Sequence, residues 1–311
     1  MENMKVDVVI PTYKPDAKLK NMVELLRNQS LPVQKILIIN TEEEYFPKGI
    51  FEPMSEVEII HIKKSEYDHG ATRDMGAKKC HGDIVVFMTQ DAMPKDDTLI
   101  AHLIEPLKDK RTACSYGKQL PLPDCEIIER YTRSFNYGDE DLLKTKASIS
   151  HMGIKTFFCS NVCAAYRKDV YEELGGFVHQ AIFNEDMIYA GRAILAGYQV
   201  AYASKARVYH SHNYNHRQQF QRNFDLGVSQ ADYPDVFSAV KSESEGVKLV
   251  KETGKYLIRI KKPWLILDLV IKSGVKFLGF QFGKSYKKLP SKIILWCTMS
   301  PSYWDRKKSY Q

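Results

Sequence analysis

The chain has 311 residues, of which 44% are hydrophobic and 27% charged, so it is long enough for one large domain with an appendage or for two domains. This composition excludes a largely disordered chain. The net charge of +7 is unevenly placed: residues 241–311 carry 16 Lys and Arg against 5 Asp and Glu, whereas residues 1–240 carry 29 against 33. The basic C-terminal part is expected to meet an anionic surface, either membrane or nucleic acid.

The first residues lead directly into an apolar run at 6–10, without a charged and then apolar signal sequence, and a cytoplasmic protein is therefore expected. The six cysteines show no C-x-x-C spacing, and nothing near Cys159 and Cys163 completes a zinc site. Reduced thiols are the expectation.

Strand-like and helix-like segments alternate through the first hundred residues. Four short apolar runs predict strands, and two segments with apolar or small residues at helical spacing predict helices. The strands are expected over 6–10, 35–39, 57–62 and 84–88, and the helices over 18–28 and 69–79. Right-handed crossovers would join these elements into a parallel sheet with ligand-binding loops along one edge.

The segment from Asp83 to Pro94 is the clearest candidate for that edge. Its five consecutive apolar residues predict a fully buried strand of a parallel sheet. Asp91 follows the carboxyl end of this strand, where an open α/β sheet binds its ligand. A carboxylate there can hold a divalent cation against a substrate diphosphate. The alternative is that Asp91 only caps a turn or helix.

The pattern after residue 100 is less regular. The pair Glu185 and Asp186 precedes a helical pattern that ends at Gly197. Around it, the sequence predicts loops over 121–123 and 137–146 and strands over 157–166, 199–202 and 207–210.

The last part of the chain has a different character. Apolar residues recur at helical spacing from Trp264 to Phe282, while Asp268, Lys272 and Lys276 occupy another face. These charges argue against a membrane-spanning helix, and a basic amphipathic helix on an anionic membrane surface fits better. Packing on the protein's own core or on a second subunit, which would give a homodimer, is the alternative.

Five short motifs occur in the order found in family 2 glycosyltransferases. They are VVIPTY at 8–13, ATRDMG at 71–76, TQDA at 89–92, NED at 184–186 and VYHSHNY at 208–214. The chain is similar to the bacterial rhamnosyltransferase branch of that family. The resemblance implies an α/β GT-A fold, a Rossmann-like and mostly parallel sheet flanked by helices, over residues 1–232. Residues 233–311 match no family motif and are expected to form a helical, basic amphipathic extension.

The resemblance also implies a nucleotide-sugar donor, a divalent metal and inversion at the transferred anomeric carbon. Breaking the donor bond leaves negative charge on a phosphate, which Mg²⁺ or Mn²⁺ stabilises. Asp91 is the expected metal ligand, although Thr89 stands where family members commonly carry the first acid of Asp-x-Asp. His210 resembles the position that completes the metal site and is preferred over His212, which lies on the same side of an extended segment. Imidazole favours Mn²⁺ over Mg²⁺, and the other histidine would be a structural hydrogen-bonding group.

Inversion by direct displacement requires a base at the acceptor hydroxyl. Asp186 matches the catalytic Asp of the family, and Glu185 would orient it or touch the acceptor. The alternative is that both acids only cap their helix and favour its dipole.

Nucleotide-sugar contacts are expected along the first strand ends. Arg73 matches the family's Arg beside the diphosphate, with an exposed salt bridge as the alternative, and Gln90 would point at ribose or phosphate. Ser160 and Asn161 either line the sugar or form a turn. The expected contact residues are Pro11, Thr12, Tyr13, Glu42, Arg73, Gln90 and Asp91.

The leading interpretation is an inverting, metal-dependent rhamnosyltransferase that uses dTDP-L-rhamnose to extend a lipid-linked cell-wall or capsular polysaccharide at the inner face of the cell membrane. Transfer of another UDP- or dTDP-linked hexose is the alternative enzyme. A non-catalytic binding module with this fold is the alternative outside enzymes, supported by the missing first Asp. Nucleic-acid binding is not expected, because the basic residues follow an apolar stripe and match no nucleic-acid motif.

Overall fold

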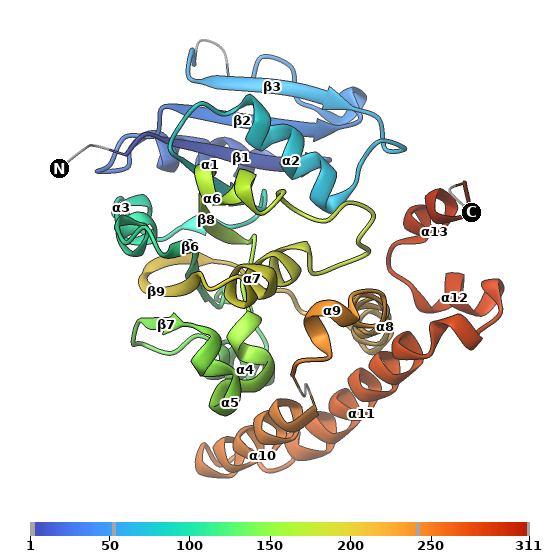
Figure 1. Cartoon of the computed structure of the whole chain (residues 1–311). Helices are drawn as coiled ribbons and strands as arrows, with labels where there is room; N and C mark the ends of the chain where they lie inside the picture. Colours follow the sequence, from blue (N-terminus) through green and yellow to red (C-terminus); the bar gives the residue numbers. More distant parts are fainter. Residues whose placement is uncertain (1–3, 52–53, 241–242, 310–311) are drawn as a thin grey trace.

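The computed structural model describes residues 4–51, 54–240 and 243–309. Within these residues, nine strands form one sheet in the order β3-β2-β1-β4-β8-β6-β9-β5, with β7 paired to β9 (Figure 1). The strands are β1 (Val6–Tyr13), β2 (Lys35–Thr41), β3 (Val57–Ile62), β4 (Ile84–Met88), β5 (Met93–Pro94), β6 (Thr112–Leu120), β7 (Leu142–Lys144), β8 (Cys163–Arg167) and β9 (Gln199–Tyr209).

The four strands predicted in the first hundred residues are confirmed as β1 to β4, and they pair in parallel. β8 runs antiparallel between β4 and β6, and β6 is parallel to β9. The carboxyl ends of β1, β2 and β4 therefore lie along one edge, as the sequence predicts.

Helices cover both faces of the sheet because the strands are apolar on both sides. Val9 and Phe87 pack in one cluster with residues of α2, α6 and α7, whereas Val8 and Val86 pack in a second cluster with α1 and α3. The helices of the first 237 residues are α1 (Ala17–Arg27), α2 (His69–Lys79), α3 (Leu99–Ile104), α4 (Ile127–Asn136), α5 (Ile149–Met152), α6 (Lys168–Glu173), α7 (Glu185–Leu195), α8 (His216–Asp232) and α9 (Pro234–Phe237).

Three predictions for the middle of the chain are wrong. The expected loop over 137–146 contains β7, in which Lys144 is fully buried and donates hydrogen bonds to Tyr116 and to backbone carbonyls. The expected strand over 157–166 begins only at Cys163. The two strands expected over 199–210 are one strand, β9, whose pairing with β6 changes register between Ala203 and Arg207.

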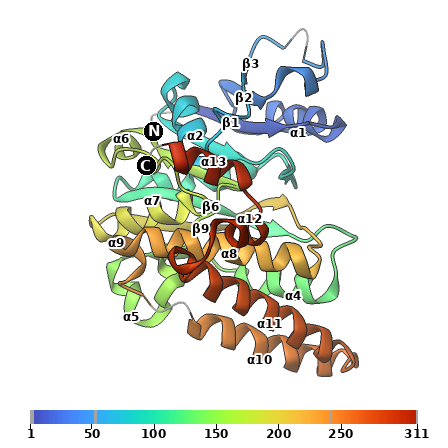
Figure 2. The same cartoon turned by 90° about the vertical axis from the view of Figure 1, so that its right-hand side faces the viewer.

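The C-terminal extension is helical, as predicted. It contains α10 (Glu243–Arg259), α11 (Leu265–Lys284), α12 (Ser291–Cys297) and α13 (Pro301–Ser309). α10 and α11 lie at the end of the molecule opposite β1, β2 and β3 (Figure 1), and α13 returns toward α2 (Figure 2). No helix among the described residues has the length and apolar character needed to cross a membrane.

The boundary expected at residue 232 stays a prediction. Val236 and Phe237 of α9 pack in the core of the sheet with α7. Phe224 and Val228 of α8 instead pack with residues of η5 (Tyr286–Lys288), α12 and α13. α8 is therefore the element on which the extension is built.

Glycines allow α8 and α11 to pack closely. A Cβ atom added at Gly283 would lie 2.0 Å from the carbonyl oxygen of Phe224, and one added at Gly279 would lie 2.3 Å from that of Phe220. Both contacts are with backbone, which cannot move aside as a flexible side chain could.

Replacing Gly283 with alanine is therefore expected to destabilise the protein by about 1–3 kcal/mol, the usual cost of overpacking. Gly274→Ala on the same helix is the matched control, because nothing lies within 4 Å of its added Cβ. That variant should gain up to about 1 kcal/mol from helix propensity. Urea unfolding of the two variants measures the difference, and equal stabilities would contradict the close packing.

Candidate active site

Asp91, His210 and His212 form a cluster whose ligand atoms lie within 4.8 Å of one another. The Nε2 atoms of His210 and His212 lie 3.5 and 3.4 Å from Asp91 Oδ2, and 3.0 Å from each other. The structure thus brings together all three side chains that the sequence predicted as metal ligands. It brings in both histidines, although the sequence favoured His210.

The short strand β5 explains how residues 119 positions apart come together. Asp91 lies in the turn after β4, two residues before β5, and His210 directly follows β9. Antiparallel pairing sets Met93 of β5 opposite Tyr209 of β9. This pairing therefore holds the turn that carries Asp91 beside the end of β9 before any ion binds.

Gln119 of β6 holds the ring of His210. Its Oε1 lies 3.0 Å from His210 Nδ1 and also accepts a hydrogen bond from Arg133, and its Nε2 donates to Ser160 Oγ at 3.0 Å. An amide oxygen can only accept, so His210 donates to it from Nδ1, and its Nε2 faces Asp91 and His212. Gln119 belongs to no sequence motif, so the sequence alone does not indicate this role.

The protonation states in the cluster suit a cation. Burial opposes charge on Asp91, but hydrogen bonding and attraction from His210 outweigh it and hold the pKa of this carboxyl below its usual value. Burial, then repulsion from His210, lowers the pKa of His212 to about 4. An ionised carboxylate beside two imidazole side chains is a set of ligands that binds divalent metals, so the residues present fit such an ion.

Replacing Gln119 with leucine is expected to weaken Mn²⁺ binding about 10–100-fold, because partners of a liganding imidazole fix its orientation and tautomer. Gln29→Leu is the control. Gln29 is also a buried, hydrogen-bonded glutamine, and its contacts lie in the Leu25, Asp96 and Ile100 backbone. Calorimetric Mn²⁺ titration compares the two, and equal affinities would contradict this role of Gln119.

Asp186 lies at the start of α7 with both carboxylate oxygens held. Its Oδ2 accepts the backbone N–H of Asn161 at 2.8 Å, and its Oδ1 accepts that of Met187 at 2.8 Å. The neighbouring Glu185 is 5% exposed and its Oε1 lies 3.2 Å from Arg73 Nη1. Only one of these bonds is made to the acids' own helix, so helix capping alone does not account for the pair.

The two acids differ in their electrostatic surroundings. Burial, then the charge of Glu185, raises the pKa of Asp186 to about 7. Burial also acts on Glu185, but the charge of Arg73 outweighs it and lowers the pKa of Glu185. Two adjacent carboxyls with pKa values pushed apart are typical of an acid–base site.

A chain of hydrogen bonds joins the cluster to this pair. His210 contacts Gln119, Gln119 donates to Ser160, and the next residue, Asn161, donates to Asp186 from its backbone and to Glu185 from its side chain. Asn161 is 3% exposed. The predicted metal ligands and the predicted base therefore belong to one polar network.

Arg73 lies in this network instead of on an exposed helix face, so the exposed salt bridge weighed for it is wrong. It is 4% exposed, and Nη1 also donates to His69 O at 3.0 Å. Its neighbour Asp74 accepts hydrogen bonds from Phe177 N at 3.0 Å and His179 Nε2 at 2.6 Å. Helix α2 thus anchors the loop that leads to Asp186.

Four of the residues expected at the nucleotide sugar, Pro11, Thr12, Tyr13 and Glu42, lie at the ends of β1 and β2. Thr12 donates to Asn40 Oδ1 at 3.1 Å, and the edge of the half-exposed Tyr13 ring meets Tyr45 at 5.9 Å between centroids. Pro11 pairs with Ile39 in the β1–β2 register.

Two of these expected contact residues bind backbone. The amide of Gln90 accepts from Tyr13 N at 2.9 Å and donates to Tyr13 O at 3.1 Å, so it braces the turn. Glu42, at φ +65°, accepts from Lys64 N at 2.5 Å. The expected contacts of Gln90 with ribose or phosphate, and of Glu42 with base or ribose, stay predictions.

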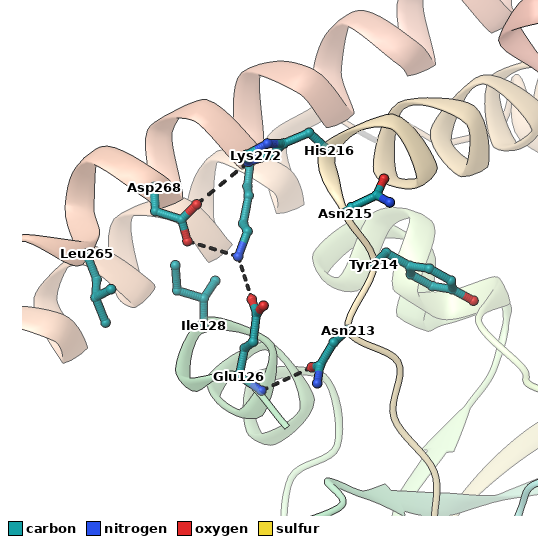
Figure 3. Close-up of a pocket in the computed structure, with 9 residues that line it drawn as sticks. All are labelled: Glu126, Ile128, Asn213, Tyr214, Asn215, His216, Leu265, Asp268 and Lys272. Carbon is teal, nitrogen blue, oxygen red and sulfur yellow. Dashed lines mark hydrogen bonds and ion pairs between the residues drawn. The ribbon is translucent and has the colours of Figure 1, made fainter. Parts of the chain in front are cut away.

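A pocket of about 510 Å³ adjoins the cluster, between α4, the segment after β9, and α11 (Figure 3). Its Tyr214 ring lies 5.2 Å from that of His212. Lys272 of α11 reaches into it and pairs with Glu126 at 2.5 Å and Asp268 at 2.9 Å. Neither Asp91 nor Asp186 lines this pocket. Its lining residues are Glu126, Ile128, Asn213, Tyr214, Asn215, His216, Leu265, Asp268 and Lys272.

Known proteins resemble the chain in sequence over nearly its whole length. Residues 7–175 match the family described as Glycosyl transferase family 2. The O-antigen chain rhamnosyltransferase RfbN of Salmonella typhimurium is 35% identical over 304 residues, covering 97% of this chain and 96% of that protein. The O-antigen chain rhamnosyltransferase WbaN of Salmonella anatum is 36% identical over 301 residues, covering 96% and 95%.

Solved structures share the fold at low sequence identity. The mannosyltransferase PcManGT from Pyrobaculum calidifontis, in complex with GDP-Man and Mn²⁺, has a TM-score of 0.55 at 13% identity and covers 96% of this chain and 85% of that one. S. aureus TarS 1-349 has a TM-score of 0.53 at 13% identity and covers 92% of each. These likenesses confirm the GT-A fold. The chain belongs to glycosyltransferase family 2 and is a glycosyltransferase related to the bacterial rhamnosyltransferases.

Proposed function

We propose that the protein transfers L-rhamnose from dTDP-L-rhamnose, with inversion, to a lipid-linked glycan of the O-antigen or capsule type. The sugar is supported by the names of RfbN and WbaN. The observation that carries the reaction is the single polar network joining Asp91, His210 and His212 to Asp186. Inverting transfer requires groups on both sides of the anomeric carbon.

Asp91, His210 and His212 would hold a divalent ion, with Mn²⁺ preferred because two ligands are imidazoles. A bound ion would supply the positive charge that neutralises the departing nucleoside diphosphate. The residues at the ends of β1 and β2 would bind the base and ribose. Tyr13, half exposed beside Tyr45, offers an aromatic surface for that purpose.

Asp186 would accept the proton of the acceptor hydroxyl at whichever oxygen faces the substrate. The two backbone N–H donors fix its plane, so the carboxylate need not reorient when the acceptor arrives. Glu185 is held by Arg73 and keeps a negative charge next to Asp186, which makes Asp186 a better base.

The extension would act at an anionic membrane surface on the cytoplasmic side. Exposed apolar residues on α11 face away from the protein, whereas Lys272 faces inward and is 16% exposed. The outward residues are Trp264, Leu267, Val270, Ile271, Phe277, Leu278 and Phe282. Lys284, Lys287, Lys288 and Lys292 are exposed beyond this stripe, which suits anionic headgroups. A homodimer through the same stripe is the alternative.

A panel of donors tests the sugar. Hydrolysis and transfer are measured with dTDP-L-rhamnose, with dTDP- and UDP-hexoses, and with Mn²⁺ or Mg²⁺. Turnover of dTDP-L-rhamnose in preference to the others is the expected result. Faster turnover of another hexose would show that this hexose, and not rhamnose, is the donor sugar. Donor binding without turnover of any sugar would favour the non-catalytic binding module.

The pH profile tests the base. A carboxyl with a pKa of about 7 is increasingly protonated, and so lost as a base, as the pH falls below that value. Transfer measured as kcat/KM should therefore fall about tenfold per pH unit between pH 6 and 5, following one ionisation. Glu185→Gln removes a charge that raises this pKa, and should shift the midpoint to lower pH. An unchanged midpoint would contradict the coupling.

A further inference from the structure

A second pocket, of about 330 Å³, lies between β6, α4 and α10, and its charge is strongly positive. Four basic side chains line it, but only one carboxylate, that of Asp139. The lining residues are Lys118, Gln119, Leu120, Pro121, Arg130, Tyr131, Arg133, Ser134, Tyr137, Asp139, Tyr256 and Arg259. Such a surplus of cations, with tyrosine hydroxyls among them, is suited to an anionic group.

Two of the four cations are not neutralised by acids. Lys118 pairs with Asp139 and Arg133 pairs with Glu129. Among the described residues, Arg130 instead donates to backbone carbonyls of the 122–125 turn, and Arg259 lies 5.6 Å from the ring centre of Tyr256. Neither guanidinium has a carboxylate partner there, so each can bind an anion without breaking an ion pair.

The pocket touches the active site. Gln119, which holds His210, lies in its wall and also accepts a hydrogen bond from Arg133. Tyr137 is 5% exposed; burial raises its pKa, Arg133 and Ser160 oppose that rise, and the charge of Asp186 adds to it. A group bound here would therefore lie beside Gln119 and Tyr137, at the part of the sheet that β6 forms and away from β1 and β2.

That position separates the pocket from the donor. β1, β2 and β3 lie at one end of the sheet, and α4 and α10 lie at the other (Figure 1). The donor diphosphate is accounted for by Asp91 and the histidines. The far wall comes from the extension, since Tyr256 of α10 stacks on Tyr131 of α4 with 4.4 Å between ring centres.

We infer that this pocket, defined by Arg130, Arg133, Arg259 and Lys118, binds the phosphate or diphosphate that joins the acceptor sugar to its lipid. The inference rests on the proposed function, since it assumes a lipid-linked acceptor. It gives the extension a second role, because α10 supplies one of the two unpaired guanidinium groups. The phosphate would fix the acceptor sugar relative to Asp186.

The test compares two acceptors on the full-length protein: a hexose joined to an alkyl chain through a diphosphate, and the same hexose joined to that chain directly. Wild-type kcat/KM should favour the diphosphate acceptor by about tenfold or more, as charge-assisted hydrogen bonds would give. Arg259→Gln and Arg130→Gln should each remove most of this preference. Lys251→Gln, which removes an exposed charge from the same helix outside the pocket, should retain it.

Binding of the alkyl diphosphate hexoside, measured calorimetrically in EDTA, needs neither a metal nor transfer. Its Kd should rise about tenfold in Arg259→Gln. Arg259 is exposed and supports no backbone, so this variant remains informative if Arg130→Gln misfolds. Equal Kd values in wild type and Arg259→Gln would overturn the inference.

Two further outcomes distinguish the anion pocket from the proposed function and from a lipid headgroup site. Binding that depends on Arg259 without any rhamnosyl transfer would support the anion pocket and remove the proposed function. Phosphatidylglycerol vesicles whose binding depends on Arg259, together with Arg259-independent binding of the hexoside, would mark a lipid headgroup site and overturn the acceptor assignment.

Discussion

Asp186→Asn is expected to lower the rate of sugar transfer by about 10²–10⁴-fold, the contribution usual for a general base. Asparagine has nearly the same shape and can still accept the N–H of Asn161, so the turn before α7 should persist. What it lacks is a basic oxygen for the acceptor proton. The expected signature is a lower kcat with little change in the Kd for dTDP-L-rhamnose.

Asp225→Asn is the matched control for that variant. Asp225 of α8 is also a buried carboxyl with a pKa raised to about 7, first by burial. It accepts hydrogen bonds from Thr298 Oγ1 at 2.6 Å and Met299 N at 3.0 Å, and so holds the extension in place. An equal loss of transfer in both variants would indicate that the substitutions act by destabilising the protein. Full activity in Asp186→Asn would show that Asp186 is not the general base.

Asp91→Ala is expected to lower transfer at saturating donor by about 10³-fold, because the charge on a diphosphate leaving group is stabilised by several kcal/mol when a cation is bound beside it. The substitution removes the cluster's single carboxylate and leaves the two imidazoles. Mn²⁺ affinity should fall, and high Mn²⁺ should restore part of the rate. EDTA should abolish wild-type transfer, with recovery on adding Mn²⁺.

Asp96→Asn supplies the control for the metal experiment. Asp96 lies just after β5 and pairs with Arg207 at 2.9 Å, so it shares the β5–β9 junction with Asp91 but not the cluster. Its replacement should cost some stability and leave the Mn²⁺ titration unchanged. A wild-type rate that is insensitive to EDTA, together with an active Asp91→Ala variant, would exclude a metal-dependent reaction at this site.

Thr89 stands where a first acid is common, and the structure places two histidine side chains beside Asp91. Family members resembling this chain commonly carry Asp-x-Asp, whereas here the ligand atoms at Asp91 are joined by two imidazoles from the segment after β9. Two imidazoles in place of a second carboxylate would favour Mn²⁺ over Mg²⁺ as the bound ion. The non-catalytic alternative, which rested on Thr89, loses its support if Asp91→Ala behaves as expected.

The sequence by itself determined the first half of the sheet and the chemical types at the site. Apolar runs such as 84–88 are buried on both faces wherever they fall, so their strand character is a local property. The motifs shared with family 2 glycosyltransferases likewise pointed to Asp91, His210, His212, Glu185 and Asp186.

Only the tertiary structure decided how these residues are held. β7 was missed because its pairing with β9 and the buried amine of Lys144 depend on partners far along the chain. Gln119 has no motif, and it gains its role only where β6 lies beside β9. Arg73 was expected beside the donor diphosphate, and its buried ion pair with Glu185 was not foreseen, since Glu185 lies 112 residues away in sequence and 3.2 Å away in space. Hydrogen bonds and charge pairs of this kind depend on distance between side chains, which a linear pattern does not contain.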